Sequence, residues 1–126
     1  MPIQSQTTEL LARTKAFALT SIRFYSGLPK ETVAQILGRQ LVRSATSAGA
    51  QYREAQRAKS IADFLSKTEG VLQEIDETTY WLELLEASVT GASDTTGSVR
   101  QEAEELLAIF VAITRKAKAH KLRGSG

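Results

Sequence analysis

Apolar side chains recur every three or four residues in four long stretches of the chain, at about residues 7–26, 29–58, 60–89 and 98–120. This spacing places them on one side of an α-helix, whereas no stretch alternates at the two-residue period of a strand. Because the connections are short, consecutive helices should run antiparallel. The pattern predicts an all-α fold, a single antiparallel up-down-up-down four-helix bundle over residues 1–126 with a flexible tail at 121–126.

Turn and capping residues set the predicted ends of these helices. Gly27 is expected to end the first helix in a left-handed conformation, and Pro29 has the fixed φ that suits the first position of the second helix. Ser60 followed by Asp63 is a capping-box pattern, which separates the second helix from the third. Residues 90–97 are rich in Thr, Ser, Asp and Gly and predict a mobile loop before the fourth helix.

The composition is that of a water-soluble globular protein. The chain has 126 residues, 42% of them hydrophobic and 24% charged, and no apolar run approaches a membrane span. Residues 1–6 lack the pattern of a signal peptide, and the absence of cysteine fits a reducing compartment. We therefore expect a cytoplasmic protein that has no membrane partner.

Charge is distributed unevenly although the net charge is only +2, too small to indicate a nucleic-acid binder by itself. The predicted second helix is basic, with four arginines against two glutamates in residues 31–57. The predicted third helix is acidic, with seven carboxylates against two lysines in residues 59–86. Two interpretations remain open: the two helices exchange ion pairs, or they present different faces to different partners.

Seven small residues follow one another at positions 44–50, in the middle of the predicted second helix. Gly49 among them costs about 1 kcal/mol of helix propensity relative to alanine. Small side chains allow another backbone to approach closely. The run therefore indicates either a tight crossing inside the bundle or a seat for another subunit or a ligand.

A second unusual segment combines carboxylates with a large aromatic residue. Glu74, Glu77 and Trp81 share one face of the predicted third helix by their spacing. Buried carboxylates need partners, and Arg43 and Lys67 are the cations that we expect to pair with them. We predict a buried or interfacial polar network that fixes register and partner choice. Its predicted members are Gln40, Arg43, Ser44, Ser47, Gln51, Glu54, Asp63, Lys67, Glu74, Glu77 and Trp81.

Enzymatic constellations are missing from the sequence. Carboxylate-bridged metal sites in bundles use a Glu-x-x-His element on each of two helices, but the only histidine is His120, near the C-terminus. Ser44 and Ser47 have no histidine base for nucleophilic catalysis. We therefore expect no enzyme and identify no catalytic residue, metal site, cofactor or small-molecule substrate.

Several segments, taken in order, resemble a known family. They are Gln-Leu-Val-Arg-Ser-Ala-Thr-Ser at 40–47, Tyr-Arg-Glu-Ala at 52–55, Ser60 with Asp63-Phe64, and Glu-x-x-Glu-Thr-x-Tyr-Trp-Leu at 74–82. From about residue 10 to residue 85 the chain resembles the bacterial four-helix-bundle proteins called 23S rRNA intervening-sequence proteins. One departure is Gln51, which stands where that family usually has asparagine.

The resemblance implies a small cytosolic four-helix protein that assembles as a ring, commonly a homopentamer, and whose activity is not established. A related branch, the accessory variability proteins of diversity-generating retroelements, forms basic pentamers that work with a reverse transcriptase and nucleic acid. This chain is much less basic than the proteins of that branch.

Two functions follow as hypotheses. The first is a non-enzymatic oligomeric protein associated with RNA or DNA, or with an enzyme that acts on nucleic acid. Its candidate phosphate contacts are Arg39, Arg43, Arg53, Arg57 and Lys59. The second is an oligomeric scaffold or adaptor that binds a protein partner and has no role with nucleic acid.

Overall fold

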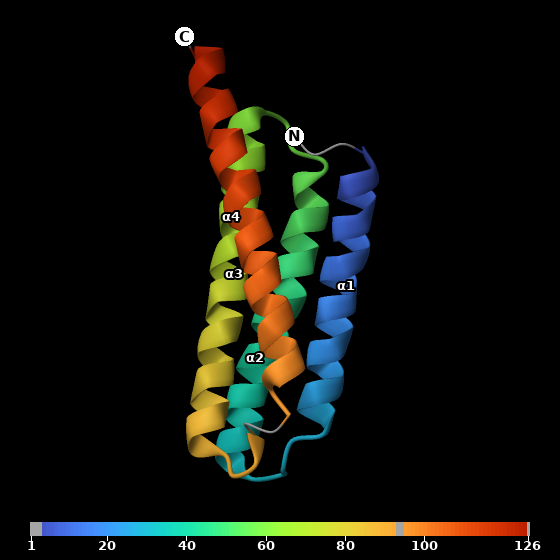
Figure 1. The fold of residues 1–126 in the computed structure, drawn as a ribbon, viewed down its shortest axis with the longest axis vertical. Coiled ribbons are helices and arrows are strands. Elements are labelled where there is room, and N and C mark those ends of the chain that lie inside the picture. The colour runs from blue at the N-terminus through green and yellow to red at the C-terminus, as the bar shows by residue number, and fades with distance from the viewer. Residues whose placement is uncertain (1–3, 93–94, 126) are drawn as a thin grey trace.

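The computed structural model describes residues 4–92 and 95–125, which form four α-helices. These are α1 (Gln4–Ser26), α2 (Thr32–Ala55), α3 (Ile61–Ser88) and α4 (Gly97–Ser125), and consecutive helices run in opposite directions (Figure 1). The predicted all-α four-helix bundle is confirmed. No helix in the described residues combines the length and apolarity needed to cross a membrane.

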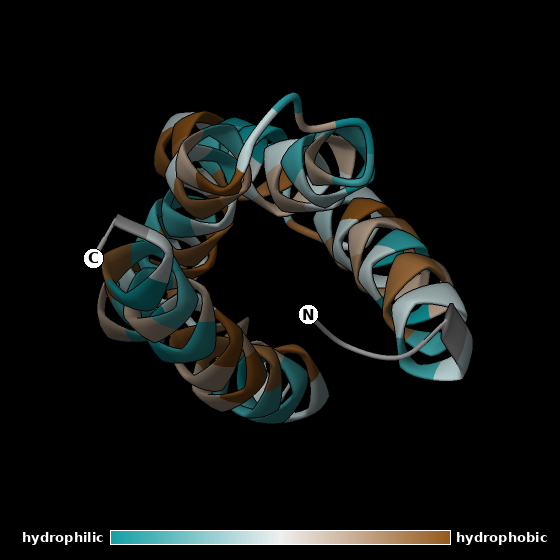
Figure 2. Ribbon diagram, turned by 90° about the horizontal axis from the view of Figure 1, so that it is seen from above, coloured by the Kyte–Doolittle hydropathy of each residue, from teal (hydrophilic) through white to brown (hydrophobic). Residues whose placement is uncertain are grey.

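Helices that follow one another in the sequence also pack side by side. The contacts join α1 to α2, α2 to α3, and α3 to α4, whereas α1 and α4 touch over little of their length. Seen from the end of the bundle, the helices follow an open arc with α1 and α4 at its two ends (Figure 2). The outer surfaces of α2 and its neighbours are therefore available for a site.

The start of α2 differs from the prediction. Glu31 is the N-cap, and its carboxylate accepts the backbone N–H of Ala34 at 3.0 Å, so the helix begins at Thr32 rather than at Pro29. Gly27 is not left-handed either, since Gly91 is the one described residue with positive φ, at 82°. The physical reason is that residues 27–31 form a connection that carries Leu28 into the core, where it is buried.

The predicted start of α3 is confirmed, whereas the predicted ends of α2 and α4 are wrong. Ser60 caps α3 as predicted, because its hydroxyl accepts the N–H of Asp63 at 3.0 Å. In contrast, α2 ends at Ala55 instead of residue 58, and α4 continues through the predicted tail to Ser125. Lysines and alanines favour helix there, and no breaker precedes Gly124. Ser93, Asp94 and Gly126, which belong to the predicted loop and tail, lie outside the described residues.

Tyr52 lies at the centre of the core. Its side chain is fully buried and meets the ring of Phe110 edge-on, with centroids 5.0 Å apart. The same cluster includes Phe17 of α1, Leu41 of α2, Ile75 of α3 and Leu106 of α4. All four helices therefore contribute to the central layer of the core. Among the described residues the Tyr52 hydroxyl has no partner within hydrogen-bond distance. Burial raises the pKa of that hydroxyl, and the nearby side chains of Thr7 and Gln56 oppose the shift in part.

The small residues of α2 serve tight helix crossings on both sides. A Cβ placed on Gly49 would lie 3.4 Å from the Thr14 carbonyl oxygen of α1. On the other side, the Ser44 hydroxyl lies 2.7 Å from that of Thr78 on α3. The run at 44–50 therefore lets α1 and α3 approach α2 closely, which is the first of the two interpretations drawn from the sequence.

Two glycines of α2 should respond oppositely to the same substitution. A Cβ on Gly38 would lie 2.5 Å from the Tyr25 ring and 2.7 Å from Leu28, so Gly38→Ala should lower the free energy of unfolding by about 1–3 kcal/mol. Gly49→Ala meets only an ordinary contact and should gain up to about 1 kcal/mol of helix propensity. Urea denaturation measures both, and equal effects would contradict the packing described.

Candidate nucleic-acid interface

A surface groove of about 1200 Å³ runs between α1 and α2 toward the α2–α3 connection. Its apolar lining consists of small or half-buried side chains, among them Ala12 and Ala18 of α1 and Ala50 of α2. Gly49 and Ala50 are among its lining residues and contribute little side-chain bulk, which leaves space between the two helices.

Five cations line this groove and come from three helices and a connection. They are Lys15 on α1, Arg53 on α2, Arg57 and Lys59 in the α2–α3 connection, and Lys67 on α3. In the described part of the chain, none of the five makes a salt bridge. All except the half-buried Lys67 are exposed. The groove therefore presents cationic side chains that no carboxylate of the fold neutralises directly.

Two carboxylates, Glu54 and Asp63, also line the groove. Asp63 is engaged by the backbone, because its carboxylate accepts the N–H of Lys59 at 3.0 Å. That bond holds the connection against the start of α3. Five cations and two carboxylates leave an excess of three positive charges.

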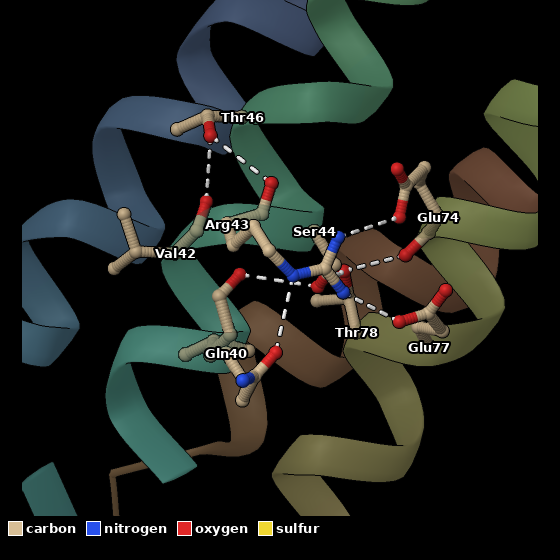
Figure 3. Close-up of polar contacts among 9 residues, drawn as sticks. Gln40, Val42, Arg43, Ser44, Thr46, Glu74, Glu77 and Thr78 are labelled. Atoms are coloured by element: carbon tan, nitrogen blue, oxygen red, sulfur yellow. Dashed lines mark hydrogen bonds and ion pairs between the residues drawn. The ribbon is translucent and has the colours of Figure 1, made fainter. Parts of the chain in front are cut away.

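Arg43 is held in a different environment (Figure 3). Its guanidinium points from α2 toward α3, with Nη2 2.6 Å from Glu77 and Nη1 3.5 Å from Glu74. Its Nε donates to the Gln40 side-chain oxygen at 3.1 Å. The two carboxylates compensate the charge of Arg43, which removes it from the set of cations open to a phosphate.

A hydroxyl pair continues this network into the core. The buried hydroxyls of Ser44 and Thr78 lie 2.7 Å apart, and Thr78 donates to the backbone oxygen of Glu74 at 2.8 Å (Figure 3). Five of the predicted network members thus meet between α2 and α3, and Thr78 completes the network. They are Gln40, Arg43, Ser44, Glu74 and Glu77.

The remaining predicted network members lie elsewhere. Glu54, Asp63 and Lys67 line the groove, and Lys67 does not reach Glu74. Gln51 extends across α3 at Gly70, where a Cβ would collide with its amide. Ser47 is half-buried. Trp81 packs against the core next to Tyr80, with its indole N–H buried and without a hydrogen-bond partner.

The candidate phosphate contacts separate into two groups. Arg53, Arg57 and Lys59 come together in the groove, whereas Arg43 is paired. Arg39 is exposed but lies fourteen residues before Arg53, which is about 21 Å along the helix. Lys15 was not predicted, although Leu11, Lys15 and Ala18 follow helical spacing along the side of α1 that faces the groove.

Other carboxylates are bound by arginines that do not line the groove. Arg13 joins α1 to α4 through Glu102 at 2.7 Å and Glu105 at 2.8 Å, and hydrogen bonding to Glu102 is the main cause that raises the pKa of Arg13. Arg100 pairs with Glu86, and its other neighbours are Glu83 and Glu104. Among the described residues, Arg43 makes every α2–α3 ion pair, so the predicted exchange between these helices is limited to one arginine.

Comparison with known proteins finds a family model and solved structures that are similar to this chain. The family model described as 23S rRNA-intervening sequence protein matches residues 6–112. A solved structure from Bacteroides thetaiotaomicron, described as a protein with unknown function from the S23 ribosomal protein family, is 31% identical with a TM-score of 0.79. The alignment covers 86% of this chain and 97% of that one. No curated protein matches the chain.

Proposed function

This chain belongs to the 23S rRNA-intervening sequence protein family, as the resemblance predicted, and we propose that it is a non-enzymatic oligomeric protein that associates with RNA or other nucleic acid. One observation carries the proposal: the groove between α1 and α2 gathers five cations that make no salt bridge in the described residues. Arginine and lysine side chains gathered in one groove suit the phosphates of a nucleic-acid backbone. Contacts to these phosphates supply most of the affinity in non-specific binding.

The distribution of carboxylates supports the same function. Except for Glu69, the glutamates of α3 and α4 pair with Arg43, Arg100 and Arg13, and none of the paired glutamates lines the groove. Of the acidic side chains described on α3, only Asp63 lines the groove, and its carboxylate accepts the N–H of Lys59. A site of this kind binds phosphates without reading the sequence of bases.

The direct test is the affinity for a fluorescently labelled RNA hairpin, measured by anisotropy at 50 mM salt. Non-specific complexes have dissociation constants of about 10⁻⁴ to 10⁻⁶ M at physiological salt and bind more tightly when the salt is lowered. We expect saturable binding in the micromolar range or below. If the anisotropy does not change up to a protein concentration about 100-fold above this range, the proposal is contradicted.

For the oligomer, the support is an exposed apolar patch on the outer side of α2 and α3. Ile36 is 54% exposed and Tyr80 is 52% exposed. Arg43 faces Glu77 across the two helices, and two turns further along this seam Ile36 comes opposite Leu84. The Trp81 ring neighbours that of Tyr80, and its buried indole N–H has no hydrogen-bond partner among the described residues, so the patch suits a surface covered by another copy of the chain.

We expect a homopentameric ring, with a light-scattering mass near five times 13.7 kDa. Ile36→Asp together with Tyr80→Asp should dissociate it, because two carboxylates would then be buried in an apolar contact. Arg39→Asp, also exposed on α2, is the matched control. A wild-type monomer at micromolar concentration would contradict the oligomer.

The same patch is also consistent with a second function, that of an oligomeric scaffold that binds a protein partner and no nucleic acid. The RNA titration separates the two, because a scaffold would oligomerise normally and leave the anisotropy of RNA unchanged.

A further inference from the structure

The end of α4 extends beyond the packed part of the bundle (Figure 1). Ala117 is its last buried residue, and residues 118–124 are all exposed. These seven residues project by about 10 Å at the helical rise of 1.5 Å per residue. We refer to residues 115–124 as the α4 end.

The α4 end is cationic on all sides. It carries Arg115, Lys116, Lys118, Lys121 and Arg123, and residues 106–126 include no Asp or Glu. At 100° per residue these side chains spread around the helix instead of forming one stripe. The helix dipole favours cations only within the last turn, so it explains Arg123 but not Arg115 or Lys116.

The α4 end and the groove lie at the same end of the molecule. Ala117 packs in a small cluster with Ala55 of α2 and Phe64 of α3, and Ala58 packs against that cluster. Ala58 stands between two groove cations, Arg57 and Lys59. The C-terminus and the α2–α3 connection accordingly lie at one end in Figure 1. Cations therefore continue from the groove to the α4 end.

Stacking platforms are few at this end. In the described residues no aromatic side chain lines the groove, Tyr80 is the one Phe, Tyr or Trp side chain that is mostly exposed, at 52%, and the imidazole of His120 is the one aromatic ring on the α4 end. Tyr80 lies twenty residues along α3 from Ser60, about 30 Å away. Proteins that hold single strands without sequence preference combine a basic groove with aromatic side chains on which bases stack. A duplex keeps its bases stacked and offers its phosphates to the protein.

We propose that the groove and the α4 end form one continuous surface that binds base-paired nucleic acid through its phosphates. This inference rests on the proposed function and adds to it both the duplex and a second element that contacts it. In a backbone-only complex, each phosphate contact raises the salt dependence of binding, so the contribution of the α4 end is measurable on its own.

The experiment compares duplex RNA, duplex DNA and an unstructured single strand of equal length by anisotropy over 50–200 mM salt. The test variant carries Lys116→Gln, Lys118→Gln and Arg123→Gln. The control carries Arg23→Gln on α1, Lys30→Gln in the α1–α2 connection and Arg39→Gln in the first half of α2, which removes the same charge outside the groove. Glutamine favours helix, and circular dichroism checks that α4 is retained. Lys118→Gln with Arg123→Gln, both beyond the last packed residue, replaces the triple variant if stability falls.

We expect a duplex to bind at least tenfold more tightly than the single strand. We also expect the test variant to lower the slope of log affinity against log salt by about 2 to 3, since each lost duplex contact removes about 0.9, while the control leaves it unchanged. Preference for duplex RNA or duplex DNA identifies which duplex is the partner, and either outcome supports the inference.

Three results would contradict either the proposed function or the inference about the duplex and the α4 end. If the wild type binds none of the three nucleic acids, the proposed function fails. If the wild type binds but the test variant has the slope of the control, the α4 end is not part of the surface. If the single strand binds as tightly as both duplexes, the duplex assignment is wrong while the groove remains a phosphate site.

Discussion

Arg53→Glu together with Arg57→Glu should weaken RNA binding by about 100-fold at 50 mM salt, because two phosphate contacts are lost from a site governed by counterion release. Both side chains line the groove and are exposed. For that reason the free energy of unfolding should stay within about 0.5 kcal/mol of the wild type. Anisotropy and urea denaturation on the same preparations separate the two effects.

The matched control is Lys30→Glu with Arg39→Glu, which makes the same change of charge far from the groove. We expect its affinity to fall only by the few-fold that long-range electrostatics cause, since exposed charges beyond about 10 Å are screened. If both pairs weaken binding equally, the effect belongs to net charge and the groove is not the site.

Tyr52→Ala should lower the free energy of unfolding by about 3–5 kcal/mol, the loss typical of a large aromatic side chain removed from a core. Tyr52 is fully buried, and its ring meets Phe110 edge-on at 5.0 Å. Tyr52→Phe is the control. In the described residues no partner lies within hydrogen-bond distance of the hydroxyl, and Thr7 and Gln56 are only nearby, so its removal should change stability by less than about 1 kcal/mol. A loss as large for phenylalanine as for alanine would show that the hydroxyl is bonded.

The pH dependence of unfolding tests the same side chain. Burial raises the pKa of Tyr52 in the folded state above the value of 10.0 that the exposed group has. The stability that this shift represents is fully present below pH 10 and is lost as the pH rises through the folded pKa. Tyr52→Phe should therefore lose less stability than the wild type between pH 10 and pH 11.5. Parallel curves for the two proteins would contradict the burial of the hydroxyl.

The hydrophobic pattern was enough to predict the four helices, because an apolar stripe at helical spacing has few other ways to be buried. The ends were harder because local signals compete. Pro29 suits the first turn of a helix, but Glu31 caps α2 with its carboxylate while Leu28 is drawn into the core. Toward the C-terminus, helix propensity carries α4 to Ser125 although residues 118–124 are exposed.

Some contacts between helices could be predicted from the sequence and others could not. Glu74 and Glu77 share a helix face, and this spacing with one nearby arginine predicted the contact with Arg43. Lys15 and Lys67 could not be assigned to the groove from the sequence, because their position depends on how α1 and α3 are rotated against α2. The contact of Arg13 with Glu102 spans 89 residues and depends on the fold closing around the core.

The most direct measurement of phosphate binding is the salt dependence of RNA affinity for the wild-type protein. Its groove alone has an excess of three positive charges. We expect log affinity to fall linearly with log salt, with a slope of about −3 or steeper, at about −0.9 for each phosphate contacted. A slope near zero, or no binding at 50 mM salt, would show that this surface does not bind nucleic acid.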